Sequence, residues 1–282
     1  MNFGLFGINF GVCADPAVAA RIARAAEAAG FDSLWTGEHI VLPDPQVPPS
    51  PLPPQAAMLD PAVALAFVAA STHRIRLATG IIILPQRNPV VLAKELASVD
   101  VVSGGRLIAG FGAGYLEPEF AALGIPFAGR GARTDEYIDA IRTLWTEPQP
   151  QFHGRFAAFA NIDAQPRPIQ LPHPPIVIGG HSPGAFLRAA RRGNGWFGFN
   201  LTPDDTQRCI AGLRAAHARV NRPPALGELE ISVHPRAALD RDGVRRLEDL
   251  GVHRLVVMRR AQSSADDLLR LVDATAALQD AR

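Results

Sequence analysis

Short runs of apolar residues alternate along the chain with longer stretches that carry apolar residues on one helical face. The short runs are typical of buried strands and the longer stretches of amphipathic helices, so the alternation indicates βα units and a parallel sheet. Eight strands in this arrangement favour an α/β fold of the closed (β/α)8 or TIM-barrel type. We expect the strands at 3–8, 33–36, 75–84, 106–111, 176–178, 196–199, 229–233 and 255–258.

A capping residue followed by proline marks the starts of several predicted helices. The capping side chain accepts a hydrogen bond from a free backbone N–H, and proline at the first helical position has no N–H to leave unpaired. Amphipathic helices are also expected at 134–147, 240–250 and 264–278, and Gly30 should end the first helix. The capping pairs are Asp15-Pro16, Asp60-Pro61, Asn88-Pro89, Ser182-Pro183 and Thr202-Pro203.

Three long connections interrupt this alternation. Two of them, 38–59 and 112–133, precede helices, so we expect insertion loops at the C-terminal rim of the strands, where barrels carry their chemistry. The first is rich in proline and is either a stiff lid over the barrel mouth or a disordered surface loop. The third, 148–175, follows a helix and should lie on the opposite side or pack along the barrel as a hairpin.

Length and charge narrow the class of protein. A chain of 282 residues suits one barrel, so we expect residues 1–282 to form a single domain. Lys plus Arg total 28 against 27 Asp plus Glu, which gives no support to a nucleic-acid or membrane-surface partner. The N-terminal residues lack the pattern of a signal peptide, and no apolar run is long enough to cross a bilayer. We therefore expect a cytoplasmic protein.

The sequence predicts neither a disulfide nor a metal site. Cys13 and Cys209 are far apart and belong to no CxxC or Cys/His cluster. The histidines show no HxH or HExxH spacing, which argues against a metal-dependent barrel hydrolase.

The segment from Gly179 to Ser182 is a candidate phosphate site. It ends a predicted strand with Gly179 and Gly180, continues through His181, and opens a helix at Ser182. Glycines let backbone N–H groups approach an anion, and the helix dipole favours negative charge at this end. The alternative is an ordinary tight turn between a strand and a helix.

Two further segments could carry chemistry at the rim. Small residues from Gly110 to Gly114 follow a strand and either leave room for a flat ring system or mark close packing at the strand end. Glu38 and His39 directly follow the second predicted strand. An imidazole there is suited to proton transfer near neutral pH, and a neighbouring carboxylate can tune it.

Several motifs, taken together in this order, resemble the F420-dependent branch of the luciferase-like monooxygenase superfamily. The likeness runs from residue 1 to about 196 and then thins. The motifs are FDSLWTGEH at 31–39, LATGI at 77–81, PQRNP at 85–89, LAKE at 92–95, SGGRL at 103–107, RTDEY at 133–137 and PPIVIGG at 174–180.

The resemblance implies a barrel that binds coenzyme F420, a deazaflavin, across its strand ends. The phosphate would lie near Gly179, Gly180, His181 and Ser182. The ring would be backed by Thr79, Gly80 and Ile81, where relatives often have a non-proline cis peptide, and contacted by the backbone of Ala113 and Gly114. Glu38 and His39 match a catalytic pair that touches the cofactor and can donate a proton, whereas Tyr115 stands where some relatives have an acid.

These observations predict an F420-dependent oxidoreductase that moves a hydride between the deazaflavin and a small, moderately apolar organic substrate. The first alternative keeps the barrel but uses FMN, as an oxygen-using luciferase-like monooxygenase. The second is a non-catalytic protein that binds a flavin or deazaflavin, because a fold does not guarantee a function. The resemblance also implies a homodimer.

Overall fold

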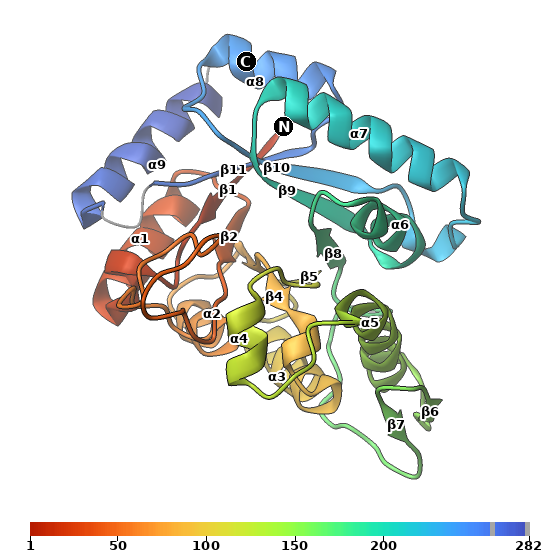
Figure 1. Cartoon of the computed structure of the whole chain (residues 1–282). Helices are drawn as coiled ribbons and strands as arrows, with labels where there is room; N and C mark the ends of the chain where they lie inside the picture. Colours follow the sequence, from red (N-terminus) through yellow and green to blue (C-terminus); the bar gives the residue numbers. More distant parts are fainter. Residues whose placement is uncertain (260–262, 280–282) are drawn as a thin grey trace.

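Eight parallel strands close into a barrel in the computed structural model, which describes residues 1–259 and 263–279 (Figure 1). The strands follow the order β3, β2, β1, β11, β10, β9, β8, β5, and pairing of Leu77 with Leu107 and of Ala78 with Ile108 joins β3 to β5. The predicted TIM barrel is confirmed. The strands are β1 (Asn2–Phe6), β2 (Ser33–Thr36), β3 (Arg76–Thr79), β5 (Leu107–Gly112), β8 (Ile176–Gly179), β9 (Gly195–Leu201), β10 (Glu230–Pro235) and β11 (Arg254–Val257).

The third predicted strand, 75–84, is wrong as one continuous element. β3 ends at Thr79, a non-proline cis peptide joins Gly80 to Ile81, and the short strand β4 (Ile82–Ile83) then pairs with the end of β5. An apolar run carries no signal for this break, because both halves are buried. The cis peptide implied by the family resemblance is confirmed.

All five predicted capping pairs begin a helix. In each case the capping side chain accepts a hydrogen bond from a backbone N–H of the first turn, and proline is the first helical residue. These helices are α1 (Pro16–Ala28), α2 (Pro61–Ala69), α3 (Pro89–Val102), α6 (Pro183–Arg192) and α7 (Pro203–Ala218).

The other helices differ more from expectation. The helix predicted from residue 134 is α5 (Arg130–Thr146), which begins earlier because Gly129, at φ 75°, ends the preceding loop before a polar first turn. α4 (Glu117–Ala122) lies in a connection for which no helix was predicted, and it is too short to show a period. The remaining helices are α8 (Arg241–Asp249), α9 (Ala265–Gln279) and the 3₁₀ turns η1 (Gly11–Ala14), η2 (Leu84–Gln86) and η3 (Pro224–Leu226).

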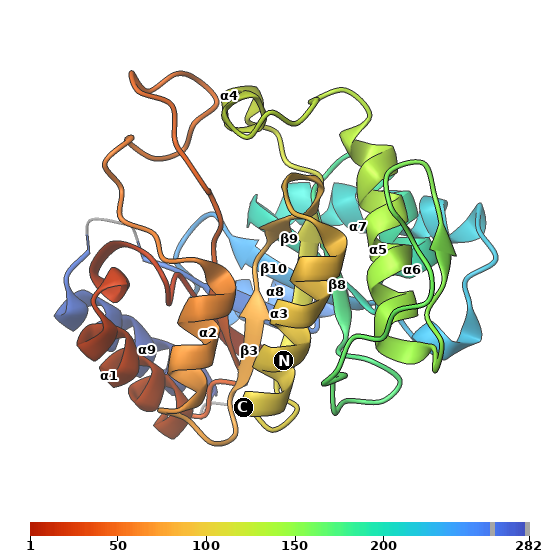
Figure 2. The same ribbon diagram turned by 90° about the horizontal axis from the view of Figure 1, so that it is seen from below.

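The long connections take up different places around the barrel. Figure 2 shows the loop between β2 and α2 beside α4, at the end of the barrel where the strands terminate. The third connection contains a hairpin of β6 (Phe152–His153) and β7 (Ala158–Phe159), as one of the two alternatives predicted. The hairpin turn packs along α5, because the Glu136 carboxylate accepts hydrogen bonds from the backbone N–H groups of Phe156 and Ala157 at 2.6 and 2.7 Å.

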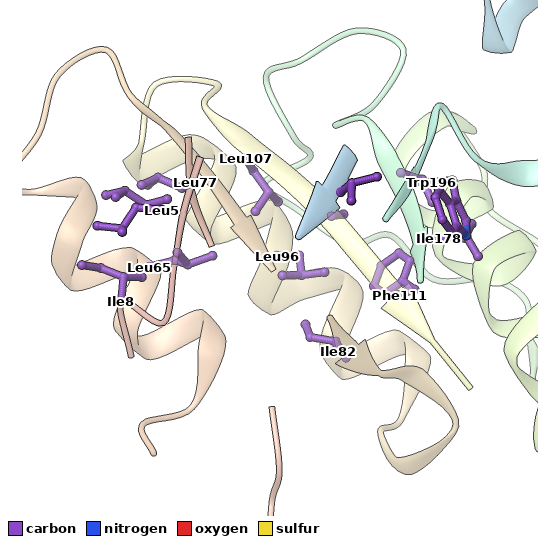
Figure 3. Packing of buried hydrophobic residues seen from close by; sticks show 14 of the residues in the cluster. Leu5, Ile8, Leu65, Leu77, Ile82, Leu96, Leu107, Phe111, Ile178 and Trp196 are labelled. Atoms are coloured by element: carbon purple, nitrogen blue, oxygen red, sulfur yellow. The ribbon is translucent and has the colours of Figure 1, made fainter. Parts of the chain in front are cut away.

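The apolar core has two parts. One fills the space between the strands and the surrounding helices (Figure 3). The other lies inside the barrel and includes Trp35, Ala78 and Phe197. Arg254, at the start of β11, is almost fully buried. Its guanidinium donates to both carboxylate oxygens of Asp32 and also contacts Glu230. Charge pairing therefore holds together the starts of β10 and β11 and the residue before β2, at the end of the barrel opposite the long loops.

Candidate active site at the barrel rim

A buried asparagine fastens the loop between β2 and α2 to the barrel. Asn9 Oδ1 accepts a hydrogen bond from Gly37 N at 2.9 Å, and its Nδ2 donates to the carbonyl oxygens of Gly37 at 2.9 Å and Leu59 at 2.7 Å. The side chain therefore ties together the two ends of the proline-rich loop. This fixed base sets the positions of Glu38 and His39, which follow Gly37.

Glu38 is buried and is directed toward Arg87. Its carboxylate forms an ion pair with the Arg87 guanidinium and accepts a hydrogen bond from Ile83 N, and Arg87 also binds Asp60 at 2.6 Å. Burial raises the pKa of Glu38, and the charge of Arg87 opposes this. Glu38 thus joins the end of β2 to β4 and, through Arg87, to Asp60 at the start of α2.

His39 instead meets two residues of the next rim connection. Its Nδ1 lies 3.3 Å from Glu119 Oε2, and its Nε2 lies 3.4 Å from the Tyr115 hydroxyl. The imidazole is only 8% exposed and the Glu119 side chain is fully buried. Glu119 Oε1 also accepts a hydrogen bond from Ile40 N at 2.6 Å. Glu119 was not predicted; its signal in the sequence was an acidic residue beside Phe120 within a rim connection.

Tyr115 is the member of this group that faces solvent. Its side chain is 48% exposed, and its ring packs edge to face with His39 at a centroid distance of 6.0 Å. Burial of part of the ring and the nearby Glu119 raise the pKa of the Tyr115 hydroxyl. The hydroxyl therefore stays protonated at neutral pH and is available as a donor.

The predicted ring-backing segment lies across the ends of β3 and β5. Thr79 Oγ1 donates to Gly110 O at 2.9 Å and accepts from Gly110 N at 2.6 Å. A Cβ on Gly80 would lie 2.9 Å from Thr36 O, so only glycine fits there. Ile81 covers the glycines of the neighbouring strand ends, since a Cβ on Gly112 would lie 2.1 Å from its Cδ1. At Gly112 the structure therefore shows close packing, the alternative to space for a ring.

Ala113 and Gly114 continue the rim from the end of β5. Gly114 O accepts a hydrogen bond from Arg130 Nε at 3.1 Å, which ties this turn to the start of α5. Ala113 and Gly114 are partly exposed and lead directly into Tyr115. Their backbone is thus on the same rim connection as the His39 partners.

The predicted phosphate segment forms an exposed turn between β8 and α6. Residues 180–184 are exposed, and Ser182 caps α6 by accepting from Ala185 N at 3.2 Å. Gly180 adopts φ 113°, a conformation that favours glycine. A Cβ on Gly184 would approach only Ser182 Oγ, at 3.9 Å, so space above the turn is open. Gly179 lies under Ile81, which links this turn to the ring-backing segment.

His181 completes this turn as a neutral hydrogen-bond donor. Its Nε2 accepts a hydrogen bond from Phe199 N at 3.2 Å, so the ring proton of the neutral imidazole is on Nδ1. Burial lowers the pKa of His181, which keeps it neutral at pH 7. Backbone N–H groups, the Ser182 hydroxyl and the Nδ1 proton form a donor set that suits a phosphate.

An aromatic wall at the ends of β1 and β9 was not predicted. The Phe199 ring lies 5.3 Å from Phe6 and 4.7 Å from His234, by centroid distance. Burial lowers the pKa of His234, so it stays neutral. The signal in the sequence was the aromatic run WFGF at 196–199, whose last residue leaves the core at the strand end.

Residues 1–259 and 263–279 contain neither a metal-binding cluster nor a membrane-spanning helix. No group of His, Cys, Asp and Glu side chains in these ranges is placed to hold a metal ion. Within the same part of the chain, no helix is both long and apolar enough to span a membrane.

The closed barrel with a polar rim site places this chain among the (β/α)8-barrel enzymes, and its sequence identifies the family. Residues 4–277 match the luciferase-like monooxygenase family, and the chain belongs to it. An uncharacterised protein of Mycobacterium tuberculosis is 32% identical, with 98% of each chain covered. The superfamily includes F420-dependent oxidoreductases and flavin monooxygenases.

Two solved structures, a monooxygenase and an F420-dependent dehydrogenase, have a similar fold. A monooxygenase from Streptomyces bottropensis is similar with a TM-score of 0.79 and 25% identity, covering 98% of each chain. An F420-dependent secondary alcohol dehydrogenase, in complex with an F420-acetone adduct, gives a TM-score of 0.78 and 16% identity, covering 95% of this chain and 96% of the other. The second likeness, at this identity, concerns the fold.

Proposed function

We propose that this protein is a coenzyme F420-dependent oxidoreductase that acts on a small, moderately apolar organic substrate. The observation that carries the proposal is His39, held at the rim between the Glu119 carboxylate and the Tyr115 hydroxyl. Reduction of a double bond by a hydride also needs a proton, and a fixed imidazole is suited to supply it. When bound, the deazaflavin would exchange the hydride with the substrate.

The rim residues that would hold the phosphate and those that would contact the ring lie next to one another. Gly179, Gly180, His181 and Ser182 would hold its phosphate, because they offer N–H and O–H donors at an exposed helix start. Thr79, Gly80 and Ile81 would back the ring, and the backbone of Ala113 and Gly114 would contact it. Gly179 lies directly under Ile81, so the two groups of residues are contiguous.

The two residues that follow Gly37 after β2, Glu38 and His39, have different roles in this proposal. His39 is the proposed catalytic residue, since its ring can exchange protons with the substrate side of the rim. Glu38, expected from the sequence to be the second catalytic residue, acts as a positioning residue in this proposal, because its carboxylate is bound to Arg87 and to Ile83 N. Phe6 and Phe199 supply an apolar wall suited to a substrate of moderate polarity.

Parallel fluorescence titrations of the purified protein with F420 and with FMN test the cofactor. The proposal predicts saturable binding of F420 and much weaker binding of FMN. A second assay follows oxidation of reduced F420 without oxygen, in the presence of an activated enone, imine or quinone. Oxidation with none of these substrates, despite tight F420 binding, would overturn the enzymatic part and leave a binding protein.

An FMN-dependent monooxygenase is the second candidate. It is supported by the monooxygenase from S. bottropensis, which is more similar in sequence than the F420-dependent dehydrogenase. The phosphate turn suits both cofactors, because both carry a phosphate. Tight binding of FMN together with oxygen consumption dependent on substrate would favour this candidate.

We also propose that the protein is a cytoplasmic homodimer. Both cysteines are buried and unpaired, which suits a reducing compartment. α2 is apolar on its outward face as well as on its core face, and Val63 is 64% exposed. Phe67 on α2 and Val91 and Val102 on the adjacent α3 are also exposed. A second copy of the chain would cover this apolar surface.

A further inference from the structure

Glu119 brings two rim connections together through one carboxylate. It lies on α4, yet both of its oxygens contact the loop after β2: Oε1 accepts a hydrogen bond from Ile40 N at 2.6 Å, and Oε2 lies 3.3 Å from His39 Nδ1. The Glu119 side chain is fully buried, and Ile40 N and His39 Nδ1 are the polar groups that lie against its two oxygens. A buried carboxylate with a donor at each oxygen is a fixed acceptor.

This arrangement fixes the tautomer of the imidazole. A carboxylate oxygen can only accept, so a hydrogen bond between Glu119 Oε2 and His39 requires the proton of the imidazole on Nδ1. In the neutral ring Nε2 is then an acceptor, and it faces the Tyr115 hydroxyl at 3.4 Å. In the protonated ring Nε2 carries a proton as well and donates it to the Tyr115 oxygen. The same contact therefore works in both protonation states.

Accessibility separates the roles of the two rings. The His39 side chain is 8% exposed, whereas Tyr115 is 48% exposed at the rim. A substrate in the barrel mouth thus reaches the phenol oxygen more readily than the imidazole behind it. The raised pKa of Tyr115 keeps its proton in place until a substrate takes it.

We propose that Tyr115 delivers the proton to the substrate, that His39 resupplies it, and that Glu119 is the positioning residue of this relay. The inference rests on the proposed function, in which one end of a reducible double bond accepts a hydride from the reduced cofactor. The other end takes the proton from Tyr115 Oη, and the Nε2 proton of the His39 imidazolium moves to that oxygen. Tyr115 ends unchanged and His39 ends neutral, keeping its Nδ1 proton in the hydrogen bond to Glu119, so the substrate gains one hydride, with its two electrons, and one proton.

The kinetic test uses three variants of the full-length protein. Tyr115→Phe keeps the ring and should lower kcat by about 100-fold, the usual size of a proton-transfer contribution, with F420 binding unchanged. Glu119→Gln should lower kcat by about tenfold, also with unchanged F420 binding. Glu117→Gln, on the exposed face of the same helix, is the control and should match the wild type. Undiminished kcat in Tyr115→Phe would overturn the delivery role.

A second test needs no cofactor and reads the tautomer of His39 from ¹⁵N NMR of histidine-labelled protein, with His39→Gln for assignment. Wild type should show the proton on Nδ1 in the neutral ring. A glutamine at 119 has one acceptor oxygen, and the Ile40 N–H, which can only donate, would occupy it. The glutamine NH2 group would then face His39 Nδ1 as a donor. Glu119→Gln should therefore move the His39 proton to Nε2, while Tyr115→Phe and Glu117→Gln should leave it on Nδ1.

The two tests fail separately. A wild-type tautomer with the proton on Nε2, or no change in Glu119→Gln, would overturn the role of Glu119 whatever the protein catalyses. A wild type that shows the expected tautomers but no turnover with F420 would overturn the proposed function and proton delivery by Tyr115, and would leave the positioning of His39 by Glu119 established.

Discussion

Replacement of Asn9 by alanine tests how the loop after β2 is held. Asn9 is fully buried and makes hydrogen bonds to Gly37 N, Gly37 O and Leu59 O. The variant leaves the two Gly37 groups buried without a partner, whereas the exposed Leu59 can turn to water. At roughly 1–3 kcal/mol for each unsatisfied group, the free energy of unfolding should fall by about 3 kcal/mol.

Urea denaturation followed by circular dichroism measures this loss. The matched control is Gln46→Ala in the same loop, where one exposed hydrogen bond to Ser50 O is removed and the change should stay below about 0.5 kcal/mol. Amide exchange at Gly37 and Ile40 should also become faster in the Asn9 variant. A loss below about 1 kcal/mol would refute the reasoning, because it would mean that the loop is held by other contacts.

Four further expectations follow from the described contacts. Arg87→Met should cost about 3–5 kcal/mol in urea denaturation, because it leaves the Glu38 carboxylate buried without its partner, and the cost should be larger at pH 8 than at pH 5. Equal costs at both pH values would contradict this. Val63→Asp should yield a monomer by light scattering, and an unchanged dimer would place the interface elsewhere. Burial lowers the pKa of His173 and His234 in the folded protein below the ordinary 6.5. As the pH falls, these two histidines therefore bind protons in the unfolded chain before they do so in the folded protein. The unfolding free energy should therefore fall as pH drops below about 6.5, and His234→Gln should flatten that decline.

The barrel was predictable because its signals are local. Each strand is an apolar run, and a capping residue such as Asp15 or Thr202 acts within one helical turn of its own position. The break after Thr79 gave no such signal, since its cause is the tight fit of Gly80 against Thr36 from another strand. Composition and spacing therefore predict the order of the strands and helices better than they predict where a strand is interrupted.

The site was only partly predictable for the same reason. His39 was expected at the rim from its place after a strand, and the turn at 179–182 from its glycines and capping serine. The contact of His39 with Glu119 joins residues 80 positions apart, and it depends on α4, whose short sequence has no clear period. Adjacency in sequence suggested Glu38 as the partner, but successive residues at a strand end point in opposite directions.

The packing of Ile81 against the glycines of β5 and β8 affects the order in which substitutions can accumulate at this rim. Alanine at position 112 would place its Cβ 2.1 Å from the Ile81 Cδ1 and 3.2 Å from its Cγ1. Alanine at 112 alone forces the Ile81 side chain to shift, whereas valine at position 81 removes that Cδ1, so the pair Ile81→Val and Gly112→Ala needs a smaller adjustment. A lineage that reshapes this wall at Gly112 gains from shortening the isoleucine first, and a mutational scan of single positions would report Gly112 as more restricted than it is together with Ile81→Val.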